Sequence, residues 1–329
     1  MTRPSSKALS RSILVTGAAG FIGSHLVERL LARGDSVVGI DNFDPFYDRN
    51  LKCANLARAE QQPGFSFYEV DLRDREAMAS LLTEHPVRAV VHLAARAGVR
   101  PSIEQPELYA DINVRGSTIL FELAVELGID RIVYASSSSV YGGRTRVPFC
   151  EEDVVDHPVS PYAATKKATE LMAHSFHHVY GIHAIGLRYF TVYGPRQRPE
   201  MAIHKFTRMM VRGEAIPVFG DGSSCRDYTF IDDIINGTLA ALDRAEGYRV
   251  YNLGGSVTTR LLDVIEKIGQ ALGVTPDVMH LPEQPGDVPR TFADIARAGR
   301  ELGYDPATPL EEGISRFVEW FRSRKEIAQ

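Results

Sequence analysis

The sequence predicts an α/β fold, in which a doubly wound parallel sheet carries a smaller, mostly C-terminal α/β lid. Two observations predict the sheet. Apolar, β-favouring runs alternate with segments of helical period through the first 190 residues. The first strand-to-helix junction carries three glycines, Gly17, Gly20 and Gly23. The lid is predicted because this regular alternation loosens beyond residue 190.

The glycine turn lies within residues 12–31, where a β-favouring run is followed by apolar residues at helical spacing. In such a turn the first glycine permits a tight bend, the second lets a pyrophosphate approach the backbone, and the third lets the helix pack close to the strand. Free N–H groups at the start of the helix then face the phosphates. The pattern predicts a Rossmann-type dinucleotide site that includes Phe21 and Ile22.

The second apolar run, 36–41, ends on a carboxylate, Asp41. An acid at the end of the second strand accepts the ribose 2′-OH of NAD and would repel the 2′-phosphate of NADP. The expected cofactor is therefore NAD. Asn42, which opens the polar and aromatic loop 42–48, is placed with Asp41 in the cofactor site.

The other elements of the first 190 residues continue the alternation. The near-continuous apolar character of 89–95 is typical of a buried parallel strand. Strands are expected over 65–70, 89–95, 131–135 and 184–189. Helices are expected over 51–60, 74–82, 106–127 and 162–180.

The second half of the chain is expected to form helices over 202–212, 232–245, 260–272 and 310–322, and short strands over 216–219 and 250–253. The prediction is an NAD-binding domain of residues 1–190, to which about 228–258 return. Residues 191–227 and 259–329 then form the substrate-binding domain. This lid is expected over the carboxyl ends of the strands, where ligands bind in open α/β sheets.

Composition and charge exclude several classes of protein. The 329 residues are 44% hydrophobic and 24% charged with a net charge of −5, which does not favour nucleic acid or a membrane surface as a partner. There is no apolar run of membrane-spanning length, and residues 1–11 are interpreted as a disordered tail. The three cysteines, Cys53, Cys150 and Cys225, lack CxxC spacing and are interpreted as packing residues in a reducing cytoplasm.

The chemistry is predicted from Tyr162 and Lys166, an i, i+4 pair on one helix face. A free tyrosine has a pKa of about 10, and a nearby positive charge lowers it by about 1–3. Lys166 and the positive ring of oxidised nicotinamide would bring Tyr162 toward neutrality as a general base. The serine run 136–139 follows the fifth strand, so a hydroxyl there can bond the substrate oxygen.

Together these motifs resemble the extended short-chain dehydrogenase/reductase family, and within it the nucleotide-sugar 4-epimerases, from residue 13 to about 321. The resemblance implies that Ser137 is the catalytic Ser/Thr and that Lys166 also binds the nicotinamide ribose. Further residues match the cofactor site of the family: Asp71 and Leu72 beside the adenine, and Ala94 and Ala95 beside the phosphates and ribose.

The serine run separates branches of the family. The 4,6-dehydratases carry Thr-Asp-Glu where this chain has Ser137, Ser138 and Ser139, and nucleotide-sugar decarboxylases place a glutamate beside their serines. Without either carboxylate, the simplest chemistry left is oxidation at C4, rotation of the 4-keto sugar and return of the hydride on the other face. That sequence of steps is a 4-epimerisation.

Residues 187–199 look like the UDP-glucuronate 4-epimerases, since UDP-galactose epimerases usually have Asn at the position of Thr191. A guanidinium with hydroxyl groups is a good partner for a carboxylate. The hypothesis is that Arg198 and Thr191, with Ser138 and Ser139, hold the C6 carboxylate. The alternative is that Arg198 serves the diphosphate or covers the surface. The expected reaction is NAD-dependent conversion of UDP-glucuronate to UDP-galacturonate.

The resemblance also suggests how the UDP is bound. It implies Arg226 for the phosphates with Tyr228 close by, and Asp287 for the ribose, while Val218 is expected to line the uracil. Relatives often have an arginine where this chain has Gln284, with Arg290 as the alternative for the phosphates.

Other interpretations stay open at this point. They are a 4-epimerase of neutral UDP-hexoses or UDP-N-acetylhexosamines, a UDP-glucuronate decarboxylase or net dehydrogenase, and a non-catalytic NAD sensor. His174, His177 and His178 lack a metal-site pattern and are expected on a helix surface. The family typically forms a homodimer through a four-helix bundle, here expected from 106–127 and 162–180.

Overall fold

The computed structural model describes residues 12–282 and 290–324. A seven-stranded sheet with the order β10-β6-β5-β4-β1-β2-β3 forms its centre, and every pairing in it is parallel. The predicted fold class is confirmed. The strands are β1 (Ser12–Thr16), β2 (Val37–Asp41), β3 (Phe65–Glu69), β4 (Val87–His92), β5 (Arg131–Ser137), β6 (His183–Tyr189) and β10 (Tyr248–Leu253).

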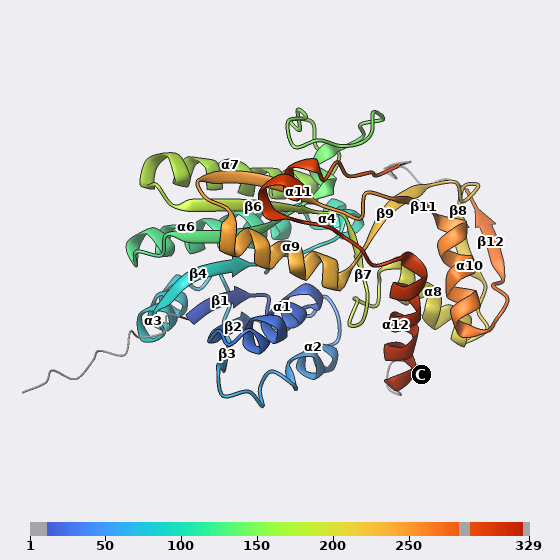
Figure 1. Cartoon of the computed structure of the whole chain (residues 1–329), viewed down its shortest axis with the longest axis horizontal. Coiled ribbons are helices and arrows are strands. Elements are labelled where there is room, and N and C mark those ends of the chain that lie inside the picture. Colours follow the sequence, from blue (N-terminus) through green and yellow to red (C-terminus); the bar gives the residue numbers. More distant parts are fainter. Residues whose placement is uncertain (1–11, 283–289, 325–329) are drawn as a thin grey trace, which may run out of the picture.

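Both faces of the sheet are buried, which explains the near-continuous apolar runs of its strands. In β1, Ile13 and Val15 belong to one core cluster and Leu14 to another. The helices on the first side are α1 (Phe21–Ala32), α2 (Arg49–Leu56), α9 (Ile231–Arg244) and α11 (Ala296–Leu302). Those on the other side are α3 (Arg75–Glu84), α6 (Gly116–Glu126) and α7 (Pro161–Tyr180) (Figure 1).

The helix expected over 106–127 is confirmed as a continuous helical stretch over 106–126, but part of its first half is π-helical, which was not predicted. The chain forms α4 (Val99–Glu104), α5 (Pro106–Tyr109) and a π-helical segment, Ala110–Arg115, before α6 begins. The wider π turn places the Asn113 side chain so that it accepts a hydrogen bond from the Arg96 N–H and donates one to the Arg96 carbonyl oxygen. A tertiary contact, not local propensity, therefore decides this backbone.

The helix that carries Tyr162 forms as expected. The Ser160 hydroxyl accepts a hydrogen bond from the Ala163 N–H at 3.1 Å and caps the start of α7. Gly181, with a φ of +74°, ends it in a left-handed conformation that favours glycine.

The second half builds a lid at one end of the sheet, on the right in Figure 1. Its short strands β7, β9, β11 and β12, together with α11, were not predicted, because three to six residues carry too little periodicity. The strands are β7 (Thr191–Tyr193), β8 (Ile216–Phe219), β9 (Cys225–Phe230), β11 (Thr258–Arg260) and β12 (Val278–Leu281). The helices are α8 (Ala202–Val211), α10 (Leu261–Leu272) and α12 (Leu310–Ser323).

The cysteines are all free thiols. Cys53 is exposed, so its interpretation as a packing residue was wrong, because it lies on the solvent side of the short helix α2. Residues 1–11, interpreted above as a tail, lie outside the described part of the chain. Within residues 12–282 and 290–324, no helix combines the length and the apolar character needed to cross a bilayer.

Candidate active site

A cavity of about 700 Å³ opens at the carboxyl ends of the central strands, beside the lid. Its lining includes residues that directly follow or end β1, β2, β4 and β5, as expected for an open α/β sheet. The predicted cofactor residues that line it are Gly17, Gly20, Phe21, Ile22, Gly23, Asp41, Asn42, Asp71, Leu72, Ala94, Ala95, Tyr162 and Lys166. The other predicted residues that line it are Ser137, Ser138, Ser139, Thr191, Arg198 and Arg226.

The glycine turn has the geometry that an anion site needs. Gly17 has a φ of +71°, and a Cβ on Gly23 would lie 2.0 Å from the Gly17 carbonyl oxygen. Helix α1 starts with neither a side-chain cap nor an acidic residue in its first turn. Its first N–H groups therefore keep their donor capacity for a ligand in the cavity, which suits a diphosphate.

Substituting Gly23→Ala is expected to destabilise the protein by about 3 kcal/mol and to weaken cofactor binding, since the added methyl group meets rigid backbone. Urea unfolding and retention of NAD after desalting would check this. Gly299→Ala is the matched control, because a Cβ at this helical position would lie 3.6 Å from the Tyr304 carbonyl oxygen, an ordinary contact distance. Equal behaviour of the two variants would contradict the packing role of Gly23.

Asp41 at the end of β2 is 8% exposed and accepts a hydrogen bond from the Phe43 N–H at 2.8 Å. Burial raises the pKa of its carboxyl, while the ammonium of Lys52, 3.7 Å away, acts in the opposite direction. Lys52 also lines the cavity and was missed, because a lysine in a polar helix gives no sign that it is 5% exposed. The pair offers an acceptor and a donor to ribose hydroxyls.

Asn42 and Asp71 lie together beside this pair. The Asn42 amide donates to Asp71 at 2.9 Å, and hydrogen bonds from Arg73 hold the pKa of the Asp71 carboxyl well below its usual range. Asp71 is therefore ionised at neutral pH. It lies at the wall of the cavity, and its place beside the adenine stays a prediction.

Tyr162 and Lys166 project from α7 toward the end of β5. The Lys166 ammonium donates to the Ala135 carbonyl oxygen at 2.8 Å and lies 6.0 Å from the centre of the Tyr162 ring. Burial raises the pKa of Tyr162, opposed by a hydrogen bond with the Ser137 side chain and by the charge of Arg198. Burial lowers the pKa of Lys166 to about 8.

The expected lowering of the Tyr162 pKa by Lys166 is not found in this structure. The ammonium of Lys166 is directed at a carbonyl group of β5, and burial of the phenol dominates. Arg198, from the lid, supplies the lowering charge instead. The pKa of Tyr162 therefore depends partly on Arg198, a residue that we expected to bind the substrate.

The serine run divides between two tasks. Ser137 accepts hydrogen bonds from the backbone N–H and the hydroxyl of Ser139, at 3.1 and 2.9 Å. Ser136 points the other way and donates to the buried carboxylate of Glu170 at 2.6 Å. Glu170 also pairs with Arg188 through two hydrogen bonds of 2.8 and 2.9 Å.

This buried ion pair was not anticipated, although an arginine in an otherwise apolar strand is a signal that could have found it. Glu170 lies one turn beyond Lys166 on α7, and Arg188 lies in β6. Arg188 donates to the Tyr141 hydroxyl at 2.9 Å. The pair thus joins α7 to Ser136, near the end of β5, and to Tyr141, which follows the serine run 136–139.

Arg196 and Arg198, which follow β7 in the lid, make different contacts. Arg198 lines the cavity, and its guanidinium pairs with Glu200 at 2.6 Å and lies 5.9 Å from the centre of the Phe46 ring. Arg196 instead forms a 2.6 Å ion pair with Glu28 of α1 and is 8% exposed. Of these two, Arg198 is therefore the one placed to meet a ligand, and Arg226 lines the same cavity.

Several expectations for the nucleotide end differ from the structure. Val218 is fully buried in the core of the lid and does not line the cavity, because its strand turns this side chain inward. Tyr228 is not among the lining residues either, since its ring packs edge-on against Tyr193. Arg290 donates to the Thr258 hydroxyl at 3.1 Å. Gln284 and Asp287 lie outside the described residues.

The histidines of α7 take part in local contacts. His177 bonds the Ile182 carbonyl oxygen at 2.8 Å, and His174 packs edge-on against Tyr248. In the part of the chain that the structure describes, no three His, Cys, Asp or Glu side chains gather as a metal ion would require.

Comparison with known proteins gives a consistent set of relatives. The sequence model of the NAD dependent epimerase/dehydratase family matches residues 13–254. A UDP-glucuronate 4-epimerase of Thermodesulfobacterium geofontis is 42% identical over 315 residues, covering 95% of this chain and 97% of that protein. The crystal structure of UDP-glucuronic acid 4-epimerase from Bacillus cereus, in complex with UDP-glucuronic acid and NAD, has a TM-score of 0.88 at 37% identity, covering 95% and 99% of the two chains.

A second similar structure is that of an epimerase of a neutral sugar nucleotide. UDP-glucose 4-epimerase from Thermotoga maritima, with UDP-glucose, has a TM-score of 0.88 at 35% identity, covering 95% of this chain and 99% of that one. The overall fold is thus equally similar to a UDP-glucuronic acid 4-epimerase and to a UDP-glucose 4-epimerase. Only the side chains of the cavity can show which of the two sugars the site suits better.

Proposed function

The chain belongs to the NAD dependent epimerase/dehydratase family, and we propose that within it the protein is a UDP-glucuronate 4-epimerase. It interconverts UDP-glucuronate and UDP-galacturonate with NAD as cofactor. One observation carries the proposal: a single cavity brings Tyr162, Lys166 and Ser137 together with Thr191 and Arg198. Conversion of UDP-glucuronate followed by proton NMR tests it.

The residues of the cavity fit NAD. The uncapped start of α1 offers N–H donors to a diphosphate, and Asp41 with Lys52 offers an acceptor and a donor to ribose hydroxyls. When bound, NAD accepts a hydride from C4 of the sugar and returns it. We assign the cofactor to residues 1–190 with about 228–258, and the nucleotide sugar to 191–227 and 259–329.

Tyr162 is assigned as the general base that takes the proton of the C4 hydroxyl and later gives it back. Ser137, which shares a hydrogen bond with Tyr162, orients the same hydroxyl. Lys166 holds a positive charge beside them, fixed by its bond to the Ala135 carbonyl oxygen. Tyr162 and Lys166 are held by α7 and Ser137 by the end of β5, so the base is in place before the sugar binds.

The acidic sugar sets a problem for this chemistry, because a 4-keto uronate is a β-keto acid and loses CO₂ readily. Holding the C6 carboxylate keeps the C5–C6 bond out of alignment with the ketone. We assign that task to Arg198 and Thr191, with Ser138 and Ser139, all of which line the cavity. For the UDP we assign Arg226 to the diphosphate and Asp287 to the ribose.

Substituting Arg198→Ala is expected to raise the KM for UDP-glucuronate roughly 10- to 100-fold, because charged hydrogen bonds contribute about 1.5–3 kcal/mol. The KM for UDP-glucose should change little. Steady-state kinetics with both sugars checks this, with Arg300→Ala on the exposed side of α11 as the control. Equal effects on both sugars would reject the carboxylate role.

A second candidate is a 4-epimerase of neutral UDP-sugars, which the likeness to the Thermotoga maritima enzyme favours. Competition between UDP-glucuronate and UDP-glucose in one reaction separates the two. A decarboxylase is disfavoured because that branch places a glutamate beside its serines, and the serine run 136–139 holds no carboxylate.

We also propose a homodimer and a cytoplasmic location. Leu171, Val179 and Tyr180 are exposed on α7, and Leu127 is exposed at the end of α6. These apolar side chains support pairing of α6 and α7 with the same helices of a second copy. Light scattering on the purified protein measures the mass, for which the dimer requires twice 36.4 kDa.

A further inference from the structure

We propose that the ion pair between Arg96 and Asp44 is a clasp that retains the cofactor while UDP-sugars exchange. The inference rests on the proposed function, in which NAD is regenerated in every cycle and has no reason to leave. Product, in contrast, must dissociate after each turnover. A device that closes only the cofactor half of the cavity would serve both needs.

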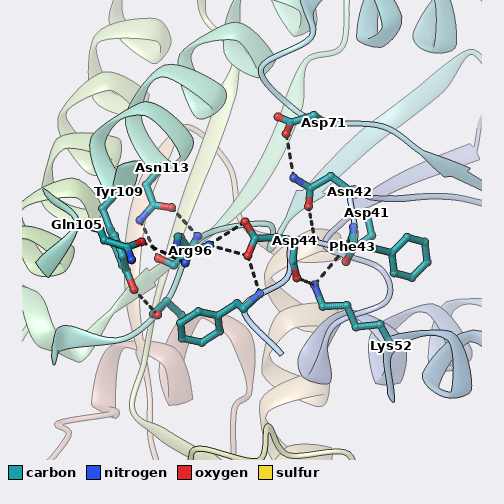
Figure 2. Close-up of polar contacts among 12 residues, drawn as sticks. Asp41, Asn42, Phe43, Asp44, Lys52, Asp71, Arg96, Gln105, Tyr109 and Asn113 are labelled. Carbon is teal, nitrogen blue, oxygen red and sulfur yellow. Dashed lines mark hydrogen bonds and ion pairs between the residues drawn. The ribbon is translucent and has the colours of Figure 1, made fainter. Parts of the chain in front are cut away.

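The pair is close and only partly exposed to solvent (Figure 2). One terminal nitrogen of the Arg96 guanidinium lies 2.7 and 2.9 Å from the two carboxylate oxygens of Asp44. The side chains are 13% and 25% exposed, so water screens the pair only in part. The Phe46 ring, its centre 5.2 Å from the guanidinium carbon, covers Arg96 from one side.

The sheet order shows what the pair spans. Strand β1 lies between β4 and β2, so the segments that follow β4 and β2 flank the glycine turn that follows β1. Arg96 belongs to the first of these segments and Asp44 to the second. The ion pair therefore joins the two flanks of the turn that we assign to the cofactor diphosphate, and both residues line the cavity.

The Arg96 side of the clasp is fixed to the catalytic helix. The Asn113 side chain accepts from the Arg96 N–H at 2.8 Å and donates to the Arg96 carbonyl oxygen at 3.0 Å. Asn113 also donates to the Thr165 hydroxyl at 3.0 Å, and Thr165 precedes Lys166 on α7. The Tyr109 hydroxyl donates to the Ala97 carbonyl oxygen at 2.7 Å.

The Asp44 side is a loop held by contacts along its own length. Asp41 accepts from the Phe43 N–H, Asn42 from the Asp44 N–H at 3.0 Å, and Asp44 from the Phe46 N–H at 2.9 Å. Lys52 of the next helix donates to the Asp44 carbonyl oxygen at 2.9 Å. Arg96 is thus the contact that ties this loop to the opposite flank.

Two buried donors, one on each flank of the glycine turn, support a ligand beneath the clasp. The Nε of Arg96 and the hydroxyl of Tyr47 are buried, and neither has a hydrogen-bond partner among the described protein atoms. Unpaired buried donors are costly and rare in folded proteins. Both residues line the cavity, where an oxygen-rich dinucleotide can accept from them.

The test measures how fast bound NAD leaves the holoenzyme. The protein is loaded with radiolabelled NAD, chased with excess unlabelled NAD, and sampled by rapid desalting. Arg96→Gln and Asp44→Asn are each expected to speed release about tenfold or more, since breaking a half-buried charge pair acts on the off-rate. Asp44→Asn keeps an oxygen for the Phe46 N–H, so the loop itself is preserved. Arg75→Gln, in an exposed ion pair between α3 and α6, is the control.

Three further results complete the test. The double variant should release NAD no faster than about the faster single variant, because both remove the same pair. Turnover lost after desalting should return when NAD is added, and UDP should bind as in the unaltered protein. Release rates that multiply in the double variant, or turnover that added NAD cannot restore, would overturn the clasp.

Different results would reject the clasp and the proposed function. If the unaltered protein holds no NAD and epimerises no sugar, the proposed function fails. If it holds NAD and Arg96→Gln releases it at the unaltered rate, the clasp alone is rejected.

Discussion

Replacing Tyr162 with Phe should lower kcat for UDP-glucuronate by about 10²- to 10⁴-fold while the protein keeps its fold and its NAD. Removing the hydroxyl removes the proposed general base, and a positioned acid–base group contributes that much to a rate. The ring, which packs edge-on against Tyr109, remains. Product formation measured by chromatography gives kcat, and the melting temperature with NAD present controls for the fold.

The pH dependence of the unaltered enzyme follows from the same group. Burial raises the pKa of Tyr162, and only the deprotonated phenol can accept the proton, so kcat should rise with pH on the acid limb. The Arg198 charge lowers that pKa, so the acid limb of Arg198→Ala should move to higher pH. A Tyr162→Phe variant that keeps more than a tenth of the rate would remove Tyr162 from the chemistry.

The second large effect is expected on stability, from the buried pair of Glu170 and Arg188. Arg188→Met should cost about 3–5 kcal/mol, because it leaves the buried Glu170 carboxylate with only the Ser136 hydroxyl and the more distant Lys167 ammonium, 3.7 Å away. The double variant with Glu170→Gln should recover part of the loss, since no charge then remains. The free energy of urea unfolding at pH 7 measures both. A loss below about 1 kcal/mol in Arg188→Met would contradict the account of the pair.

The pair also predicts how acid acts on the fold. Burial raises the pKa of Glu170, but the hydrogen bonds and charge of Arg188, together with the Ser136 hydroxyl and the charge of Lys167, more than offset it. The net pKa lies below the ordinary value of 4.5. The stabilisation is therefore fully present above pH 4.5 and is lost as the pH falls through the lowered pKa of the folded state. In Glu170→Gln this part of the acid dependence should disappear.

The features that could be predicted from the sequence are those whose chemistry is carried by neighbouring residues. Gly17 and Gly23 act on one another across a single turn, and Tyr162 and Lys166 are one helical turn apart. Such spacings survive whatever the rest of the chain does. The strands of the sheet were predictable for a related reason, because burial on both faces leaves long apolar runs.

What could not be predicted depends on contacts between distant segments. Arg96 meets Asp44 and Glu170 meets Arg188 only once the sheet has formed. Arg188 stands out as a charged residue in an apolar strand, but nothing in the sequence names Glu170 as its partner, and Arg96 and Asp44 look like solvated charges. The π-helical turn that presents Asn113 follows from its bonds to Arg96, not from local propensity. In the lid, the strand over 216–219 was predicted, but four residues do not show which way Val218 points. The strand that carries Tyr228, β9, was not predicted.

The central claim is that this protein epimerises UDP-glucuronate with NAD that it already holds. The most direct test is proton NMR of the purified protein incubated with UDP-glucuronate, with and without added NAD. UDP-galacturonate is expected in both samples, without build-up of the pentose that decarboxylation would give. An unchanged spectrum in both samples, with conversion of UDP-glucose or UDP-N-acetylglucosamine by the same preparation, would contradict it.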